Sequence, residues 1–134
     1  MTNIQKTNPE ISQFVELLHN NGKIKPFLED IFLIEVHVAG LYHVDNMEKI
    51  FPNIKEGDYL ELYREKHNEH DKLAILVKYK GEKIGHVPRK NNEILANLMD
   101  GGKEIYGIVS LAFDGEVNED YPFKEIDFKV FLKE

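Results

Sequence analysis

The sequence predicts an all-β fold with helical additions, in the form of a small six-stranded barrel of the OB-like or SH3-like kind. Between residues 30 and 132, runs of alternating apolar and polar residues recur with the period of two that half-buried strands show. Turns containing glycine or proline separate these runs, and one helical stripe of apolar residues follows the fourth run. Because closing a short, curved sheet removes its exposed edges, a barrel is the economical arrangement.

A helix is predicted ahead of the barrel, over residues 8–21. Asn8 is suited to cap this helix, and Pro9 fits its first position. Apolar residues then follow at helical spacing: Ile11, Phe14, Val15 and Leu18. We therefore expect a helical appendage over residues 1–29 and a barrel domain over residues 30–134.

The first four strands of the barrel are predicted from alternation and turns. Apolar and polar residues alternate in three segments, residues 34–38, 60–63 and 73–79. Residues 45–52 are expected to form a short helix or turn that ends at Pro52. A tight hairpin turn at residues 80–82 leads into a fourth strand over residues 83–87.

The second half of the barrel starts with the inserted helix. Asn91 or Asn92 is expected to cap it and Gly101 to close it. The apolar face that should pack on the barrel consists of Ile94, Leu95, Leu98 and Met99. A strand over residues 104–113 places four apolar residues on alternate positions: Ile105, Val109, Leu111 and Phe113. After an acidic loop at residues 114–121, the last strand carries Ile126, Phe128, Val130 and Leu132.

Composition and charge narrow the classes of function. The chain has no cysteine, which excludes disulfides, thiolate zinc sites and cysteine nucleophiles. No signal-type or membrane-spanning apolar run is present, and we expect a cytoplasmic protein. The net charge of −7 argues against nonspecific binding to long duplex DNA. Residues 61–90 nevertheless hold eight Lys or Arg against five Asp or Glu, which suits a short nucleic-acid contact.

The most informative polar run spans residues 64–75. Within it, Asn68 and Asp71 lie in a predicted loop, where their short side chains are able to bond backbone amides and fix the loop. The same loop is also able to present Asp71 to a ligand hydroxyl while neighbouring rings stack on a base. Both interpretations remain open from the residues alone.

A second polar run spans residues 83–90. His86 lies at the end of a predicted strand, and Arg89 and Lys90 follow at the start of a helix. Backbone amides together with a guanidinium suit a phosphate group. The alternative is a solvated basic turn without a ligand.

Neither metal nor enzyme chemistry is indicated. His67, His70, Asp71 and His86 could surround a metal, but their spacing is irregular and thiolates are absent, so we expect no metal and no cofactor. The sequence has no P-loop, nucleophile elbow, His-Glu-x-x-His helix or dinucleotide fingerprint. We therefore expect a protein that is not an enzyme.

The segment Phe27-Leu28-Glu29-Asp30-Ile31 resembles the bacterial stand-alone form of the HIRAN domain, and four later segments in order resemble the domain itself. They are Val38-Ala39-Gly40-Leu41, the run from Arg64 to Ile75 with Asn68 and Asp71, Lys83-Ile84-Gly85-His86-Val87-Pro88-Arg89, and Leu98-Met99-Asp100-Gly101-Gly102-Lys103. The similarity covers roughly residues 34–132. It implies an OB-like module that captures the 3′-hydroxyl end of single-stranded DNA, as in the forms fused to Snf2-type helicases.

The resemblance also implies roles for individual residues. Asp71 matches the aspartate that contacts the 3′-hydroxyl, Asn68 matches an asparagine of the same pocket wall, and His86 ends the Gly-His strand. Arg89, followed by Lys90, falls where a basic residue approaches phosphate. The expected stacking residues are Tyr42, His43 and His70. Of these, His70 stands where the family usually has tyrosine, and Tyr42-His43 stands where an Arg-Tyr pair is usual.

The sequence thus predicts a nucleic-acid-binding module that holds single-stranded DNA 3′ ends for a separate helicase, nuclease or repair protein. The alternative is a protein-interaction adaptor without DNA binding, whose acidic surface and predicted helix over residues 8–21 dock a partner.

Overall fold

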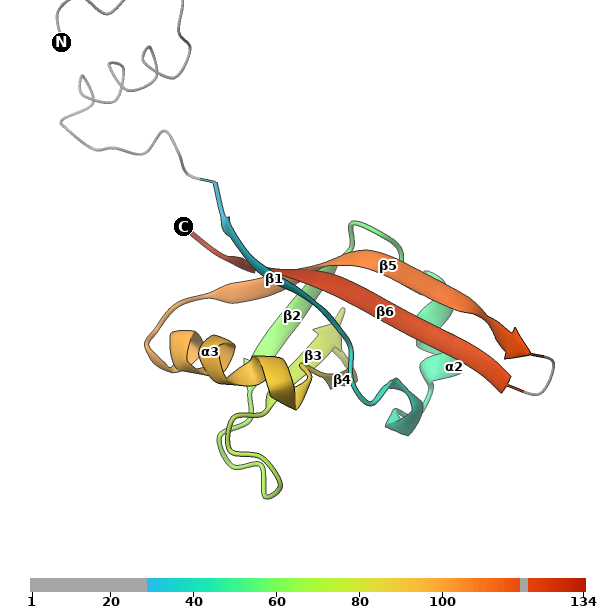
Figure 1. Ribbon diagram of the computed structural model, residues 1–134, viewed down its shortest axis with the longest axis horizontal. Helices are drawn as coiled ribbons and strands as arrows, with labels where there is room; N and C mark the ends of the chain where they lie inside the picture. The colour runs from blue at the N-terminus through green and yellow to red at the C-terminus, as the bar shows by residue number, and fades with distance from the viewer. Residues whose placement is uncertain (1–28, 119–120) are drawn as a thin grey trace, which may run out of the picture. The chain divides into compact units, whose positions relative to one another are not determined.

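The computed structural model describes residues 29–118 and 121–134, and the predicted helix at residues 8–21 lies outside them. Within these ranges, six strands form one antiparallel sheet in the order β1-β6-β5-β2-β3-β4 (Figure 1). The strands are β1 (Ile31–His37), β2 (Tyr59–Arg64), β3 (Ile75–Tyr79), β4 (Glu82–His86), β5 (Ile105–Asn118) and β6 (Tyr121–Leu132). The helical segments are η1 (Leu41–His43), α2 (Met47–Ile50), η2 (Phe51–Asn53) and α3 (Arg89–Asp100). Residues Asp30–Lys133 form one compact unit.

A short bridge between the two outer strands closes the sheet into a barrel. Just after β1, the Ala39 amide donates to the His86 carbonyl at 2.8 Å, and the His86 amide donates back at 2.9 Å. Gly85 permits this approach, because a Cβ atom there would lie 2.3 Å from the Ala39 carbonyl oxygen. The predicted mostly-β, OB-like barrel with one helix inserted after its fourth strand is confirmed.

The core fills the inside of this barrel. Its largest fully buried side chains come from β2 to β6: Leu60, Ile75, Val77, Ile84, Val109, Ile126, Phe128 and Val130. The predicted alternation holds in the first three segments, since Val36, Leu60, Leu62, Ile75 and Val77 are buried and, within each strand, the residues between them face outward. None of the helices in the described ranges has the length and apolar character needed to cross a bilayer.

The α3 helix differs from its prediction in its start and in its buried face. It begins at Arg89, so Asn91 and Asn92 lie inside it and do not cap it. Ile94, which we expected to pack on the barrel, is 73% exposed, whereas Asn92 is 3% exposed. The buried face therefore includes a polar residue, because Asn92 has a hydrogen-bond partner in Asp71.

The β5–β6 hairpin is longer than predicted. The residues expected to form an acidic loop, 114–121, mostly continue the two strands, which run side by side across Figure 1. A register shift between Val109 and Leu111 breaks the predicted alternation, so Leu111 and Phe113 face outward. Pro52 also differs from its prediction: it lies within η2 near the start of that turn, a position that tolerates proline.

Candidate functional site

A recess of about 300 Å³ lies where the barrel closes. Its lining consists of Ala39, Gly40, Asn68, His70, Asp71, Ala74, His86, Val87 and Arg89. Five of these were predicted as site residues from two separate sequence runs: Asn68, His70, Asp71, His86 and Arg89. Pairing of β3 with β4 places the two runs next to each other, and the closing bridge adds Ala39 to the same recess.

Asn68 builds the loop between β2 and β3. Its side-chain oxygen accepts hydrogen bonds from the His70 amide at 2.8 Å and from the Asp71 amide at 3.0 Å. Its amide nitrogen donates to Glu65 Oε1 at 3.3 Å. The loop-fixing role that its residue type allows is therefore present, and it sets the position of Asp71.

Asp71 is a fixed carboxylate on one wall of the recess. One oxygen accepts from the Leu73 amide at 2.9 Å, and the other accepts from Asn92 Nδ2 at 2.8 Å. The Leu73 hydrogen bond, with help from Asn92 and the positive charge of Arg89, lowers the pKa of Asp71 despite partial burial. A carboxylate offers about four acceptor positions, so this charged group retains capacity for a further donor.

Arg89 forms the cationic rim of the recess. Its Nη2 atom donates to the His70 carbonyl at 2.9 Å, and its Nε atom lies 3.7 Å from Asp71 Oδ2. The side chain is 72% exposed, so most of its five N–H donors remain available to an anion. The recess therefore combines a hydrogen-bond acceptor, the Asp71 carboxylate, with a permanently charged guanidinium 3.7 Å away.

The His86 ring is positioned by a hydrogen bond with Glu65. The Nε2 atom of His86 lies 2.6 Å from Glu65 Oε1. Burial is the largest influence on Glu65 and opposes its ionisation, but the hydrogen bonds of His86 and Asn68 outweigh it and lower its pKa. Glu65 thus connects the β4 end of the recess to the loop that carries Asp71.

Arg64 anchors the far side of the same loop. It makes two hydrogen bonds to the Asp100 carboxylate, at 2.9 and 3.1 Å. It also donates to the carbonyls of Ala74 at 2.7 Å and Lys72 at 2.9 Å. These bonds tie the loop to the end of α3, which stiffens the support of the recess.

Among the predicted site residues whose side chains the structure describes, two are not brought into this recess. Lys90 lines a different one, beside Ile34 and Ile94. His43 lies exposed in η1, outside the lining of the recess. The backbone of Tyr42 belongs to η1, but its side chain lies outside the described part of the structure.

From the sequence, no supporting role was assigned to Arg64, Glu65 or Asn92. Asn92 carried a usable signal, because it lies three and four positions before Leu95 and Ala96 on one helical face. Glu65 carried none, since its contact with His86 spans 21 residues and depends on strand register.

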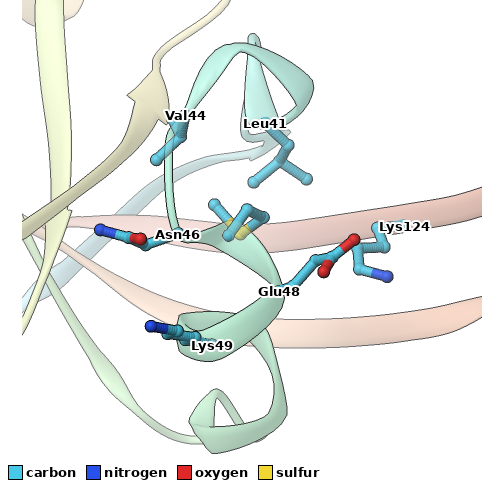
Figure 2. Close-up of a pocket in the computed structure, with 7 residues that line it drawn as sticks. Leu41, Val44, Asn46, Glu48, Lys49 and Lys124 are labelled. Carbon is cyan, nitrogen blue, oxygen red and sulfur yellow. The ribbon is translucent and has the colours of Figure 1, made fainter.

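A larger recess of about 490 Å³ lies beside α2. Figure 2 shows Leu41 and Val44 above its centre and Glu48 extending toward Lys124. Lys124 already pairs with Asp114 at 3.1 Å. The lining of this recess shares no residue with that of the candidate site among the side chains that the structure describes.

The histidines do not converge on a metal site within the described ranges. No group of three or more His, Cys, Asp or Glu side chains is placed there to hold a metal ion. We expect purified protein to contain no stoichiometric zinc. Elemental analysis after dialysis tests this, because structural zinc survives that treatment; about one zinc per chain would contradict it.

An OB-like barrel with a small, charged recess at its closure defines a compact ligand-binding domain. The chain belongs to the HIRAN domain family, whose model matches residues 31–119. A comparison with curated proteins finds no match.

Solved structures resemble the chain over most of its length. A protein from Lactobacillus plantarum has a TM-score of 0.60 and 27% identity, covering 77% of this chain and 97% of that one. The HIRAN domain of human HLTF has a TM-score of 0.54 and 23% identity, covering 78% of this chain and 81% of that one. The HLTF HIRAN domain in its DNA-bound conformation gives a TM-score of 0.48 at 22% identity, covering 79% and 81%.

Proposed function

We propose that this chain is a nucleic-acid-binding module and that its recess captures the 3′-hydroxyl end of single-stranded DNA. Its membership of the HIRAN family supports the general class. The observation that carries the specific proposal is the pairing of the Asp71 carboxylate with the Arg89 guanidinium in one recess.

The proposed reading of the strand end depends on charge. The lowered pKa of Asp71, caused first by the Leu73 hydrogen bond, keeps this carboxylate charged at neutral pH. A carboxylate accepts a hydrogen bond from a sugar hydroxyl and repels a terminal phosphate. Arg89 then meets the phosphate that precedes the last nucleotide, while His70 and His86 offer rings to the base.

The proposed module has no catalytic role and uses no cofactor. Within the described residues, the carboxylates nearest the recess are bound to neighbouring side chains or amides that position the loop. We propose that a separate helicase, nuclease or repair protein processes the end that this module holds. An adaptor without DNA binding is the alternative that the following experiment tests.

We expect strands with a 3′-hydroxyl to bind more tightly than strands with a 3′-phosphate, and Asp71→Ala to remove this preference. Loss of a charge-assisted hydrogen bond costs about 1.5–3 kcal/mol, or roughly tenfold or more in affinity. Fluorescence anisotropy with labelled single strands measures both affinities. Asp71→Asn is the matched variant, because it removes the charge while keeping an acceptor for the Leu73 amide.

Arg89→Ala should weaken all strands alike and flatten the salt dependence by about one unit, as loss of a phosphate contact does. Lys90→Ala is the control, since it removes a neighbouring charge that lies outside the recess. Equal binding of the two strand ends, or an unchanged preference in both Asp71 variants, would show that the end-reading role is wrong and favour the adaptor.

A further inference from the structure

Away from this recess, four aromatic rings form a continuous row across β1, β6, β5 and β2. Ring centroids are 5.8 Å apart for Phe32 and Phe131, 5.7 Å for Phe131 and Tyr106, and 5.3 Å for Tyr106 and Tyr59. The last two pairs are stacked with planes only 20° apart. Both end rings are open to solvent, with Phe32 52% and Tyr59 56% exposed.

The Tyr59 end of this row opens into a recess of about 430 Å³, the Tyr59 recess. Its lining includes Tyr59, Tyr63, Lys66, Lys103 and Tyr106. The Tyr106 hydroxyl donates to the Asp30 carboxylate, which holds the Tyr106 ring in place beneath Tyr59. Because Tyr59 stacks on Tyr106 through one face and is half exposed, its other face is available to a planar ligand.

The side chains that line the Tyr59 recess carry a net positive charge, whereas the whole chain is negative. Four cations, Arg64, Lys66, Lys103 and Lys133, line it against three carboxylates on a chain of net charge −7. Arg64 is bound to Asp100, and Lys133 lies 3.5 Å from Glu104. Lys66 lies 3.8 Å from Asp100 but is 62% exposed, and Lys103 makes no ion pair among the described residues. These two ammonium groups are therefore suited to a phosphate beside a stacked ring.

We propose that the Tyr59 recess binds one nucleotide within a single-stranded nucleic acid. Its base stacks on the open face of Tyr59 and extends the aromatic row, and its phosphate lies near Lys66 and Lys103. This inference rests on the proposed function, because it adds a second contact for the same class of ligand. It favours a nucleic acid over a protein partner because it combines an open ring face with two lysines, Lys66 and Lys103, of which Lys66 is largely exposed.

The experiment uses the full chain and a labelled single strand of about sixteen thymidines, close to the largest site size of one OB fold. We expect Tyr59→Ala to weaken binding about tenfold, within the range for loss of one base–aromatic stack. Tyr59→Phe should bind like the unaltered chain, because it keeps the ring. Phe32→Ala is the matched control, since it removes an equally exposed ring from the other end of the row.

Strands ending in a 3′-hydroxyl and a 3′-phosphate separate this inference from the proposed function. Tyr59→Ala should weaken both strands equally and leave any end preference unchanged. If the unaltered chain prefers the 3′-hydroxyl strand but Tyr59→Ala has no effect, the second contact is wrong and end capture stands. If the unaltered chain shows no end preference but Tyr59→Ala weakens binding, end capture is wrong and the second contact stands.

Three results would overturn the assignment of the Tyr59 recess. They are an equal loss of affinity in Phe32→Ala, displacement of the strand by free thymidine monophosphate at the same nucleotide concentration, and no strand binding at all.

Discussion

Gly85→Ala is expected to destabilise the protein by about 3 kcal/mol or more, at the upper end of overpacking costs. An added Cβ would lie 2.3 Å from the Ala39 carbonyl oxygen and 2.5 Å from Val38 Cγ1. The carbonyl cannot turn away, because it accepts the His86 amide in the bridge that closes the barrel. Relief of the clash therefore requires the two outer strands to separate.

Urea unfolding of Gly85→Ala and of the unaltered chain measures this loss. Gly101→Ala is the control, because its added Cβ would meet nothing closer than 3.3 Å at the end of α3. We expect Gly101→Ala to change the free energy of unfolding by less than about 1 kcal/mol. A Gly85→Ala protein as stable as the control would mean that the bridge is not a close-packed feature in solution.

Asp127→Asn is expected to stabilise the protein at alkaline pH by about 2 kcal/mol. Asp127 lies on β6, opposite His37 of β1 and Leu111 of β5. Burial, together with the hydrogen bond and negative charge of Glu125 and the charge of Glu35, raises its pKa to about 6. The folded state thus favours the neutral carboxyl, a form that asparagine imitates at every pH.

The pH dependence of this effect follows from the raised pKa. A group whose pKa is higher in the folded state than its ordinary value of 3.8 contributes stability at acidic pH and loses it as pH rises through about 6. Thermal unfolding should therefore show a midpoint higher by about 7 °C for Asp127→Asn at pH 8, with the difference nearly gone at pH 4. Asp45→Asn, at an exposed position, is the control, and a gain that is equal at both pH values would contradict the assignment.

Local chemistry explains why much of the fold was predictable. Alternation identifies the buried faces of β2 and β3, because a strand with one face in the core repeats every two residues. The turn at Lys80 and Gly81 was equally predictable, because glycine favours tight hairpin turns. Both residues adopt the positive φ angles of such a turn. These features depend on neighbours in sequence, which the chain displays directly.

Features set by distant contacts were not predictable in the same way. Periodicity allows two overlapping faces of α3, and the contact of Asn92 with Asp71, 21 residues away, decides between them. The acidic segment after Phe113 has poor strand propensity, yet pairing with β6, with one register shift between Glu116 and Asn118, extends β5 to Asn118.

The same distinction between local and distant contacts applies to the candidate site. The Asn68-x-x-Asp71 loop was visible because its hydrogen bonds are local. The contacts that support it, Glu65 to His86 and Arg64 to Asp100, span 21 and 36 residues and depend on strand register and helix placement. The loop motif therefore predicts where the Asp71 side chain lies, but not the distant contacts that hold the loop in place.

The bridge between Ala39 and His86 has a consequence for local opening of the barrel. Both residues line the recess, so a molecule that contacts the two of them there spans the seam at which the outer strands meet. Opening the seam then requires release of that molecule, and saturation adds to the opening free energy by about 1.4 kcal/mol for each tenfold excess over Kd. The amides of Ala39 and His86 would accordingly exchange with solvent more slowly when the recess is occupied, which makes this seam a hydrogen-exchange reporter for a ligand that carries no label.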